Sequence, residues 1–200
     1  MRSHVASVVR NAFLMMAGTL ASRVLGLARE IITAAFFGAS RQIDAFNIAY
    51  TLANLLRQLL AEGALSAAFV PVFSRSLQNE GHERALSLAR QAMGVLLMAG
   101  SAVVAAGIVL SPVLVTFMAP GFDAEKTSLA ILLTRRLFPF LLIISLAALA
   151  MGVLNSVDSY FVPAIAPGLS NIVYIVILLI AAPRWGIDCL VAAVLAGGGA

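Results

Sequence analysis

The chain has 200 residues, of which 62% are hydrophobic and only 11% are charged, and its mean hydropathy is +1.01. Soluble domains carry about 25% charged residues, so this composition excludes an ordinary soluble domain and indicates an integral membrane protein. The net charge is +4, but the basic residues form no continuous soluble patch, which argues against nucleic-acid binding. The single cysteine, Cys189, excludes an internal disulfide, and without a His/Cys cluster we expect neither a metal site nor a cofactor.

The predicted fold class is an all-α, polytopic transmembrane helix bundle. A bilayer core about 30 Å thick needs roughly 20 apolar residues for each helical span, and turn residues separate the apolar runs of this chain. The expected spans cover residues 7–37, 44–73, 91–118, 128–154, 161–182 and 187–200. The last run stops without a cap or a polar tail, so we expect the sixth span to be truncated and the chain to be a fragment.

The first span, 7–37, carries Arg23, Arg29 and Glu30 in its interior. With 100° between successive helical residues, the polar side chains in the body of this span fall within one arc of about 120°. A lipid-facing arginine costs roughly 2.5–3.5 kcal/mol, so this polar stripe is expected to face a hydrated cavity.

The second span, 44–73, repeats the arrangement over an arc of about 180°. Its polar arc contains Asp44, Asn47, Tyr50, Thr51, Asn54, Arg57, Gln58, Glu62 and Ser66. We expect the two stripes to share one aqueous chamber and the uncharged third and fifth spans to form its lipid-exposed wall. Three arginines outnumber two glutamates there, and the planar guanidinium suits phosphate or pyrophosphate, so an anionic ligand is predicted.

The predicted substrate-binding residues are Arg23, Arg29, Glu30 and Arg57, followed by Asp44, Asn54 and Glu62. No residue is predicted to be catalytic. A structural alternative stays open, in which Arg23–Glu30 and Arg57–Glu62 are ion pairs that only fix helix packing. Asp44 also suits the N-terminus of the second span, where a carboxylate stabilises the helix.

The distribution of positive charge predicts a cytoplasmic N-terminus, because cytoplasmic loops are enriched in arginine and lysine. The side of the N-terminus carries Arg2, Arg10, Arg75, Arg84 and Arg90, and the opposite side carries Arg41, Lys126 and Arg184. The first residues also fit a cleaved signal peptide, but the helical pattern continues through residue 37 and favours a membrane span.

Several segments of the sequence resemble those of the MurJ (MviN) lipid II flippases, which belong to the multidrug/oligosaccharidyl-lipid/polysaccharide exporter superfamily. The resemblance runs in order over nearly the whole chain. It is carried by SRVLGLARE, FFGAS, DAFNIAY, NLLRQLLAEGALSAAFVPVF, APGF, LFPFLLIISLAALAMGVLNS and FVPAIAP.

The resemblance implies a multi-pass protein of the bacterial cytoplasmic (inner) membrane that serves peptidoglycan biosynthesis, cell wall biogenesis and cell shape. Such a protein is a transporter and not an enzyme. It moves lipid II, the undecaprenyl-diphosphate-linked precursor, from the cytoplasmic to the periplasmic leaflet by alternating access through a cationic central cavity. The chain would be the N-terminal lobe, in contact with lipid II and membrane lipids, and the sequence identifies no protein partner.

By the same resemblance, Arg23, Arg29 and Arg57 would engage the diphosphate and headgroup of the substrate. The chain departs from the family at Glu30, where Asp is common, and at Gln58, where a second basic residue is frequent. Two alternatives remain: an exporter of another lipid-linked oligosaccharide or of drugs, and a membrane enzyme acting on a lipid diphosphate. The enzyme alternative lacks a suitable base, because His4 lies in the N-terminal tail and His82 lies in a predicted loop.

Overall fold

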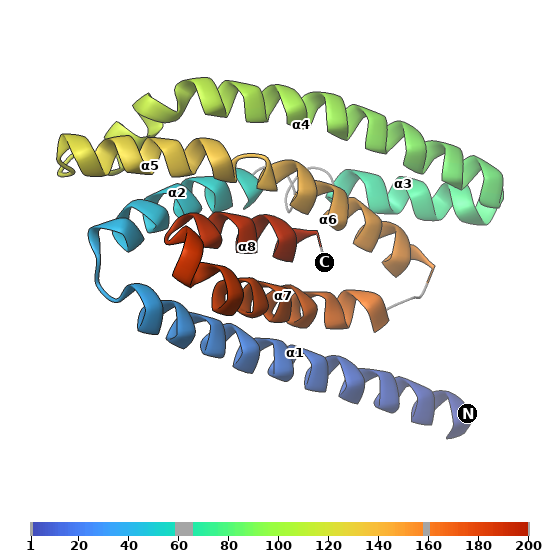
Figure 1. The fold of residues 1–200 in the computed structure, drawn as a ribbon. Helices are drawn as coiled ribbons and strands as arrows, with labels where there is room; N and C mark the ends of the chain where they lie inside the picture. The colour runs from blue at the N-terminus through green and yellow to red at the C-terminus, as the bar shows by residue number, and fades with distance from the viewer. Residues whose placement is uncertain (1, 59–65, 158–160, 200) are drawn as a thin grey trace.

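The computed structural model describes residues 2–58, 66–157 and 161–199, and over these ranges it contains helices and no strand (Figure 1). The helices are α1 (Arg2–Phe37), α2 (Arg41–Arg57), α3 (Ser66–Asn79), α4 (His82–Met118), α5 (Ala124–Leu137), α6 (Phe140–Ser156), α7 (Phe161–Trp185) and α8 (Asp188–Gly198). Within the described part of the chain, three segments are long and apolar enough to cross a membrane, namely His82–Met118, Ala124–Ser156 and Ile165–Trp185. The predicted all-α transmembrane class is confirmed.

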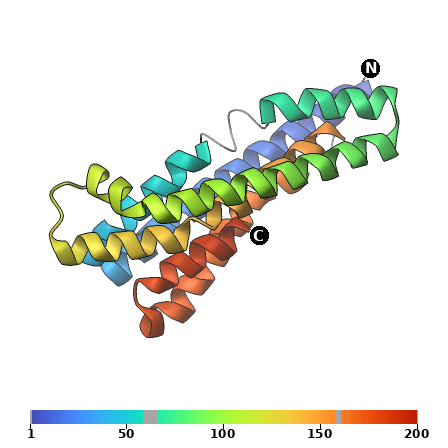
Figure 2. The ribbon, with the colours of Figure 1, turned by 90° about the horizontal axis from the view of Figure 1, so that it is seen from above.

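The helices form an elongated bundle, and several of the connections lie at its two ends, whereas the α5–α6 break lies midway along it (Figures 1 and 2). The α1–α2, α4–α5 and α7–α8 connections lie at the left end in Figure 1, and the N-terminus and the α3–α4 connection lie at the right end. Helix α1 packs mainly on α7, α7 packs on α8, and α2 packs on α5. The first two predicted spans are therefore held apart by other helices instead of packing directly on each other.

The boundaries of several helices differ from the sequence prediction. The predicted span 44–73 corresponds to α2 and most of α3, and residues 59–65 between them lie outside the described part. Residues 74–90, which the predicted spans leave as a polar connection, are largely helical, because α3 continues to Asn79 and α4 begins at His82. This segment is amphipathic: Leu77, Ala85, Leu88 and Ala89 pack in a hydrophobic cluster, while its charged side chains stay exposed. Gly81, with φ of +88°, makes the turn.

The predicted span 128–154 is divided into α5 and α6 at Phe138 and Pro139. Proline has no N–H to donate, and its ring clashes with the carbonyl of the preceding turn, so the helix breaks there. Phe138 is fully buried against Gly107 of α4, where an added Cβ would lie 2.3 Å from Phe138 Cε2. The absence of a side chain at Gly107 therefore makes room for the ring at the break.

A second proline, Pro112, removes one backbone hydrogen bond inside α4, and two side chains replace the missing donor. The carbonyl of Ile108 lacks its usual helical donor because Pro112 has no N–H. Ser111 Oγ donates to that carbonyl at 2.8 Å, and Arg135 Nε lies 3.3 Å from it and 2.9 Å from Ser111 Oγ. Arg135 thus joins α5 to the irregular turn of α4.

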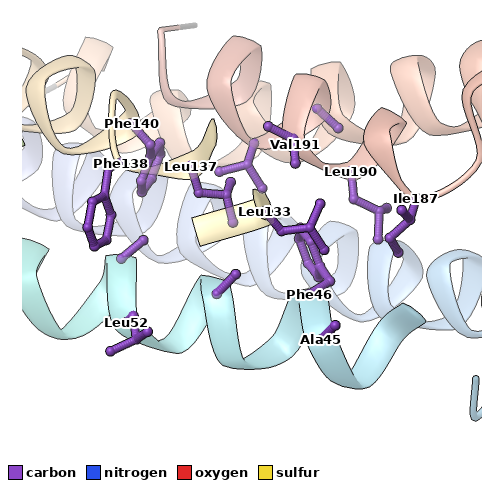
Figure 3. Packing of buried hydrophobic residues seen from close by; sticks show 14 of the residues in the cluster. Ala45, Phe46, Leu52, Leu133, Leu137, Phe138, Phe140, Ile187, Leu190 and Val191 are labelled. Atoms are coloured by element: carbon purple, nitrogen blue, oxygen red, sulfur yellow. The ribbon is translucent and has the colours of Figure 1, made fainter. Parts of the chain in front are cut away.

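The buried hydrophobic side chains form two clusters. The larger one joins α2, α4, α5, α6, α7 and α8, and Figure 3 shows Phe46, Leu133 and Leu190 within it. The smaller one lies at the α3–α4 end and comprises Phe69, Phe73, Ala85, Leu96 and Leu149. Helix α1 instead exposes an apolar stripe, with Met16, Leu20, Val24, Leu27 and Ile31 each at least 60% exposed.

Candidate functional site

A cavity of about 410 Å³ lies between α1 and α2, with α7 and α8 forming its remaining wall. Its polar lining residues are Arg29, Glu30, Thr33, Asp44, Asn47, Tyr50 and Tyr174. A second cavity of about 140 Å³ shares Arg29, Tyr50 and Tyr174 with the first and extends along α7 and α8. A polar space lined from both α1 and α2 is therefore present, and of the three arginines expected to share it, only Arg29 lines it.

The turn between α1 and α2 sets the mouth of this cavity. Gly38 ends α1 with φ of +55°, a conformation that glycine adopts without a steric penalty. Ser40 then caps α2, because its Oγ accepts a hydrogen bond from the backbone N–H of Ile43 at 3.3 Å.

Arg29 is the charged group at the centre of the site. Its Nη2 lies 2.8 Å from Glu30 Oε1, and its guanidinium carbon lies 5.1 Å from the ring centroid of Tyr174. The Arg29 side chain is 27% exposed, that of Glu30 is 67% exposed, and Tyr174 is buried. Stacking on an aromatic face stabilises a guanidinium and leaves its in-plane N–H groups free to bind acceptors such as phosphate oxygens.

Contacts between α1 and α7 hold Arg29 in this position. Asn171 Nδ2 donates to the Ser22 carbonyl at 3.2 Å, and this hydrogen bond joins α7 to α1. Thr33 Oγ1 donates to the Arg29 carbonyl at 2.8 Å, within α1. Because Tyr174 lies one turn beyond Asn171 on α7, the same helix–helix contact that fixes α1 also places the ring under the guanidinium.

Ion pairs join the first turn of α2, where Asp44 lines the cavity, to the start of α5. Lys126 Nζ lies 2.5 Å from Asp44 Oδ2 and 4.2 Å from the ring centroid of Phe122, and Arg41 forms an ion pair with Asp123. Asp44 therefore lines the cavity with its charge already balanced by Lys126. The capping role that the sequence also suggested for Asp44 belongs to Ser40, while Asp44 lies in the first turn of α2.

The structure separates the predicted arginines. Arg29 lines the cavity with Glu30 and Asp44, whereas Arg23 and Arg57 are not among its lining residues. Arg23 is exposed on α1, and the described residues form no ion pair with it. Arg57 is half-buried at the end of α2, where its Nε donates to Asn54 Oδ1 at 3.3 Å. Glu62 lies outside the described residues.

Glu30 pairs with Arg29 and not with Arg23, so the ion pair that we considered as a structural alternative for Arg23 and Glu30 is not formed. The guanidinium of Arg29 is thus the one that the carboxylate of Glu30 balances.

Two residues of the site, Asn171 and Tyr174, were not predicted. They lie in the uncharged fifth span, which we expected to form only a lipid-exposed wall. Their spacing of three residues places them on one face of α7, and this pair of polar side chains in an apolar run is the signal that could have identified them. Among the residues that the structure describes, no group of three or more His, Cys, Asp or Glu could hold a metal ion.

Comparison with known proteins relates the chain to one family. Residues 33–200 match the sequence profile described as "Lipid II flippase MurJ". The lipid II flippase MurJ of Burkholderia cenocepacia is 41% identical over 192 residues, which cover 94% of this chain and 37% of that protein. A probable lipid II flippase MurJ of Rhizobium tropici is 38% identical over 172 residues, covering 84% of this chain and 32% of that protein.

A solved structure has the same fold. It is described as "Lipid II flippase MurJ, inward closed conformation" and superimposes with a TM-score of 0.79 at 28% sequence identity. The match covers 94% of this chain and 40% of that one. The chain therefore spans well under half the length of the relatives that it matches.

Proposed function

The chain belongs to the lipid II flippase MurJ family, and from this premise we propose that the full-length protein containing it moves lipid II across the bacterial cytoplasmic membrane. The observation that carries the proposal is the position of Arg29, a cation stacked on Tyr174 inside a polar cavity of about 410 Å³. Lipid II offers this site a diphosphate, and arginine binds phosphate oxygens in a bidentate manner.

In this mechanism the diphosphate and sugars of lipid II enter the cavity while the polyprenyl tail stays in the bilayer. Arg29 binds the diphosphate, and Asn47 and Tyr50 offer hydrogen bonds to neighbouring polar groups of the headgroup. Arg23 and Arg57 lie outside the cavity that Arg29 lines. They add positive charge that attracts the anionic headgroup as it enters or leaves the cavity. Rocking of this lobe against the rest of the protein then exposes the bound headgroup to the opposite side of the membrane.

Substitution of Arg29 tests the proposal. Charge-assisted hydrogen bonds contribute about 1.5–3 kcal/mol, so Arg29→Ala should lower lipid II translocation by about tenfold or more. Arg29→Lys should retain part of the activity, because lysine keeps the charge and loses the bidentate geometry. Arg184→Ala, at an exposed position near the end of α7, is the control and should translocate normally. Normal translocation by Arg29→Ala at equal expression would refute the proposal.

We also infer that the N-terminus is cytoplasmic. The N-terminus and the α3–α4 connection lie at one end of the bundle (Figure 1). Near that connection the chain carries Arg75, Arg84 and Arg90, and short loops rich in arginine are retained in the cytoplasm.

Thiol labelling of intact cells tests this orientation. A cysteine at Asn79 should be protected from a membrane-impermeant maleimide, and a cysteine at Glu125 should react. Cys189 is buried, so its background is low. The reverse pattern would contradict the inferred orientation and leave the proposed activity untouched.

A further inference from the structure

A second groove lies far from the Arg29 cavity, between α3 and α4 at the right end of the bundle (Figure 1). Its volume is about 430 Å³, and its lining includes Arg75 and Ser76 of α3 and Arg84, Ser87 and Gln91 of α4. The smaller hydrophobic cluster packs α3 and α4 onto α6 through other residues of the two helices. The mechanism proposed above makes no use of this groove.

The groove is lined by two arginines and one carboxylate, which gives it an excess of one positive charge. Arg84 Nε lies 3.4 Å from Glu80 Oε2, and Ser76 Oγ lies 3.4 Å from the same oxygen. Arg75 is exposed, and no other described residue forms an ion pair with it. Glu80 therefore offsets the charge of Arg84. Arg75 keeps an uncompensated positive charge and five N–H donors.

The groove also lies where the polar and apolar parts of α4 meet. Beyond Gln91, α4 carries no charged residue as far as Met118, and this helix is long and apolar enough to cross the membrane. Val72 and Leu88 line the groove among its polar residues, and Val95 and Met98 are exposed further along α4. A ligand in the groove thus meets positive charge and hydroxyl groups beside apolar surface that continues toward the bilayer interior.

We propose that this groove binds the headgroup of an anionic phospholipid, with the phosphodiester held by Arg75 and Arg84. Arginine matches the geometry of phosphate oxygens, and Ser87 and Gln91 supply further hydrogen bonds. The first acyl carbons contact Val72 and Leu88. The continuous apolar surface favours a membrane lipid over a soluble phosphate, which would leave that surface uncovered.

Titration of the purified full-length protein with phosphatidylglycerol, followed by native mass spectrometry, tests the proposal. A juxtamembrane arginine strengthens binding to an anionic lipid by a factor of about five, so Arg75→Gln/Arg84→Gln should weaken phosphatidylglycerol binding by about 20- to 30-fold. Arg90→Gln removes the same type of charge from an exposed position of α4 that does not line the groove, and it should change the affinity less than about twofold. Phosphatidylcholine should bind weakly to all three proteins.

Four results would overturn the proposal, the last of them in a lysine variant described below. The first is unchanged phosphatidylglycerol binding in the double variant, and the second is equal loss in Arg90→Gln, which would indicate a diffuse charge effect. The third is binding of soluble glycerol 3-phosphate as tight as that of the lipid. Because the double variant could also unfold, the conservative Arg75→Lys/Arg84→Lys variant is measured alongside, and it should keep a preference for phosphatidylglycerol over phosphatidylcholine. Loss of that preference in a folded lysine variant would contradict binding through charge.

Discussion

Arg29 and Glu30 are consecutive in α1, and consecutive helical residues do not normally face each other. Their long side chains nevertheless meet at 2.8 Å, at a cavity that Tyr174 also lines. The guanidinium is therefore balanced by its own neighbour. In the proposed mechanism, the phosphate of the substrate has to compete with the Glu30 carboxylate for Arg29, and Glu30 pairs with Arg29 again when the phosphate leaves.

Glu30→Gln should strengthen lipid II binding and slow its release. The pair is largely exposed on the Glu30 side, so its free energy is of the order of 1 kcal/mol, and removing the competing charge should tighten binding by about fivefold. Binding to the purified full-length protein and the initial translocation rate would be measured together. Glu30→Asp keeps the charge and serves as the control. Weaker binding by Glu30→Gln would mean that Glu30 contacts the substrate directly instead of competing with it.

Tyr174 should act as a positioning residue for Arg29 through its ring. A partly desolvated cation–π contact contributes about 1–2 kcal/mol, so Tyr174→Leu should weaken lipid II binding by about five- to thirtyfold. Tyr174→Phe keeps the aromatic face and should bind nearly as well as the parent protein. A purely structural role for Tyr174 would instead lower the thermal stability of Tyr174→Leu and leave the affinity of the folded fraction unchanged.

At the scale of elements, the junction of α4, α5 and α6 is built around two prolines and one glycine. Pro139 divides α5 from α6, Pro112 frees the Ile108 carbonyl that Ser111 and Arg135 satisfy, and Gly107 accommodates Phe138. Side chains of the same or a neighbouring helix occupy the space at Gly107 and donate to the carbonyl that Pro112 leaves without a backbone donor. The junction is therefore specified by the close fit of these helices as well as by hydrophobic burial.

Gly107→Ala should destabilise the protein. The added Cβ would lie 2.3 Å from Phe138 Cε2, and Phe138 is fully buried, so the strain should cost about 1–3 kcal/mol. Gly94→Ala is the matched control in the same helix, because an added Cβ there has no neighbouring atom within 4 Å. Thermal unfolding of the detergent-solubilised full-length protein should show a lower midpoint for Gly107→Ala only. Equal midpoints for the two variants would show that the ring moves aside freely.

The polar stripe of α1 and the polar arc of α2 could be predicted, because α-helical periodicity fixes which residues share a face. Their partners could not, since periodicity within one helix says nothing about which helix lies opposite. Asn171 and Tyr174 therefore escaped prediction, and Lys126, expected to act only through loop charge, proved to be the partner of Asp44. The charged residues around Gly81 predict a loop, because charged runs are typical of connections. The segment is helical because Leu77, Ala85 and Leu88 pack in the smaller cluster.

At the scale of the whole molecule, α1 forms a thin wall between the Arg29 cavity and the surroundings of the bundle. One face of α1 lines the cavity and packs on α7, and the other exposes the apolar stripe that includes Val24, Leu27 and Ile31. We expect lipid to cover this apolar stripe in the membrane. Water should therefore reach one side of α1 and not the other.

Cysteine accessibility should reveal this difference. Asn47→Cys, in the cavity, should react with a water-soluble maleimide at least about tenfold faster than Leu27→Cys, because a thiol in an apolar environment ionises poorly. Added lipid II should protect the cysteine at position 47. Both variants should react fully after denaturation, which controls for expression. Equal rates in the folded protein would contradict the assignment of the two faces.

The division of the buried core into two clusters has a mechanical consequence. Helices α4 and α6 contribute to both clusters, whereas α3 contributes only to the smaller one at the arginine-rich end. Moving α3 away from α6 would therefore open the smaller cluster and leave the packing of α2, α5 and α8 in the larger cluster intact. The bundle should therefore deform more readily at the α3–α4 end than at the end where α1 meets α2.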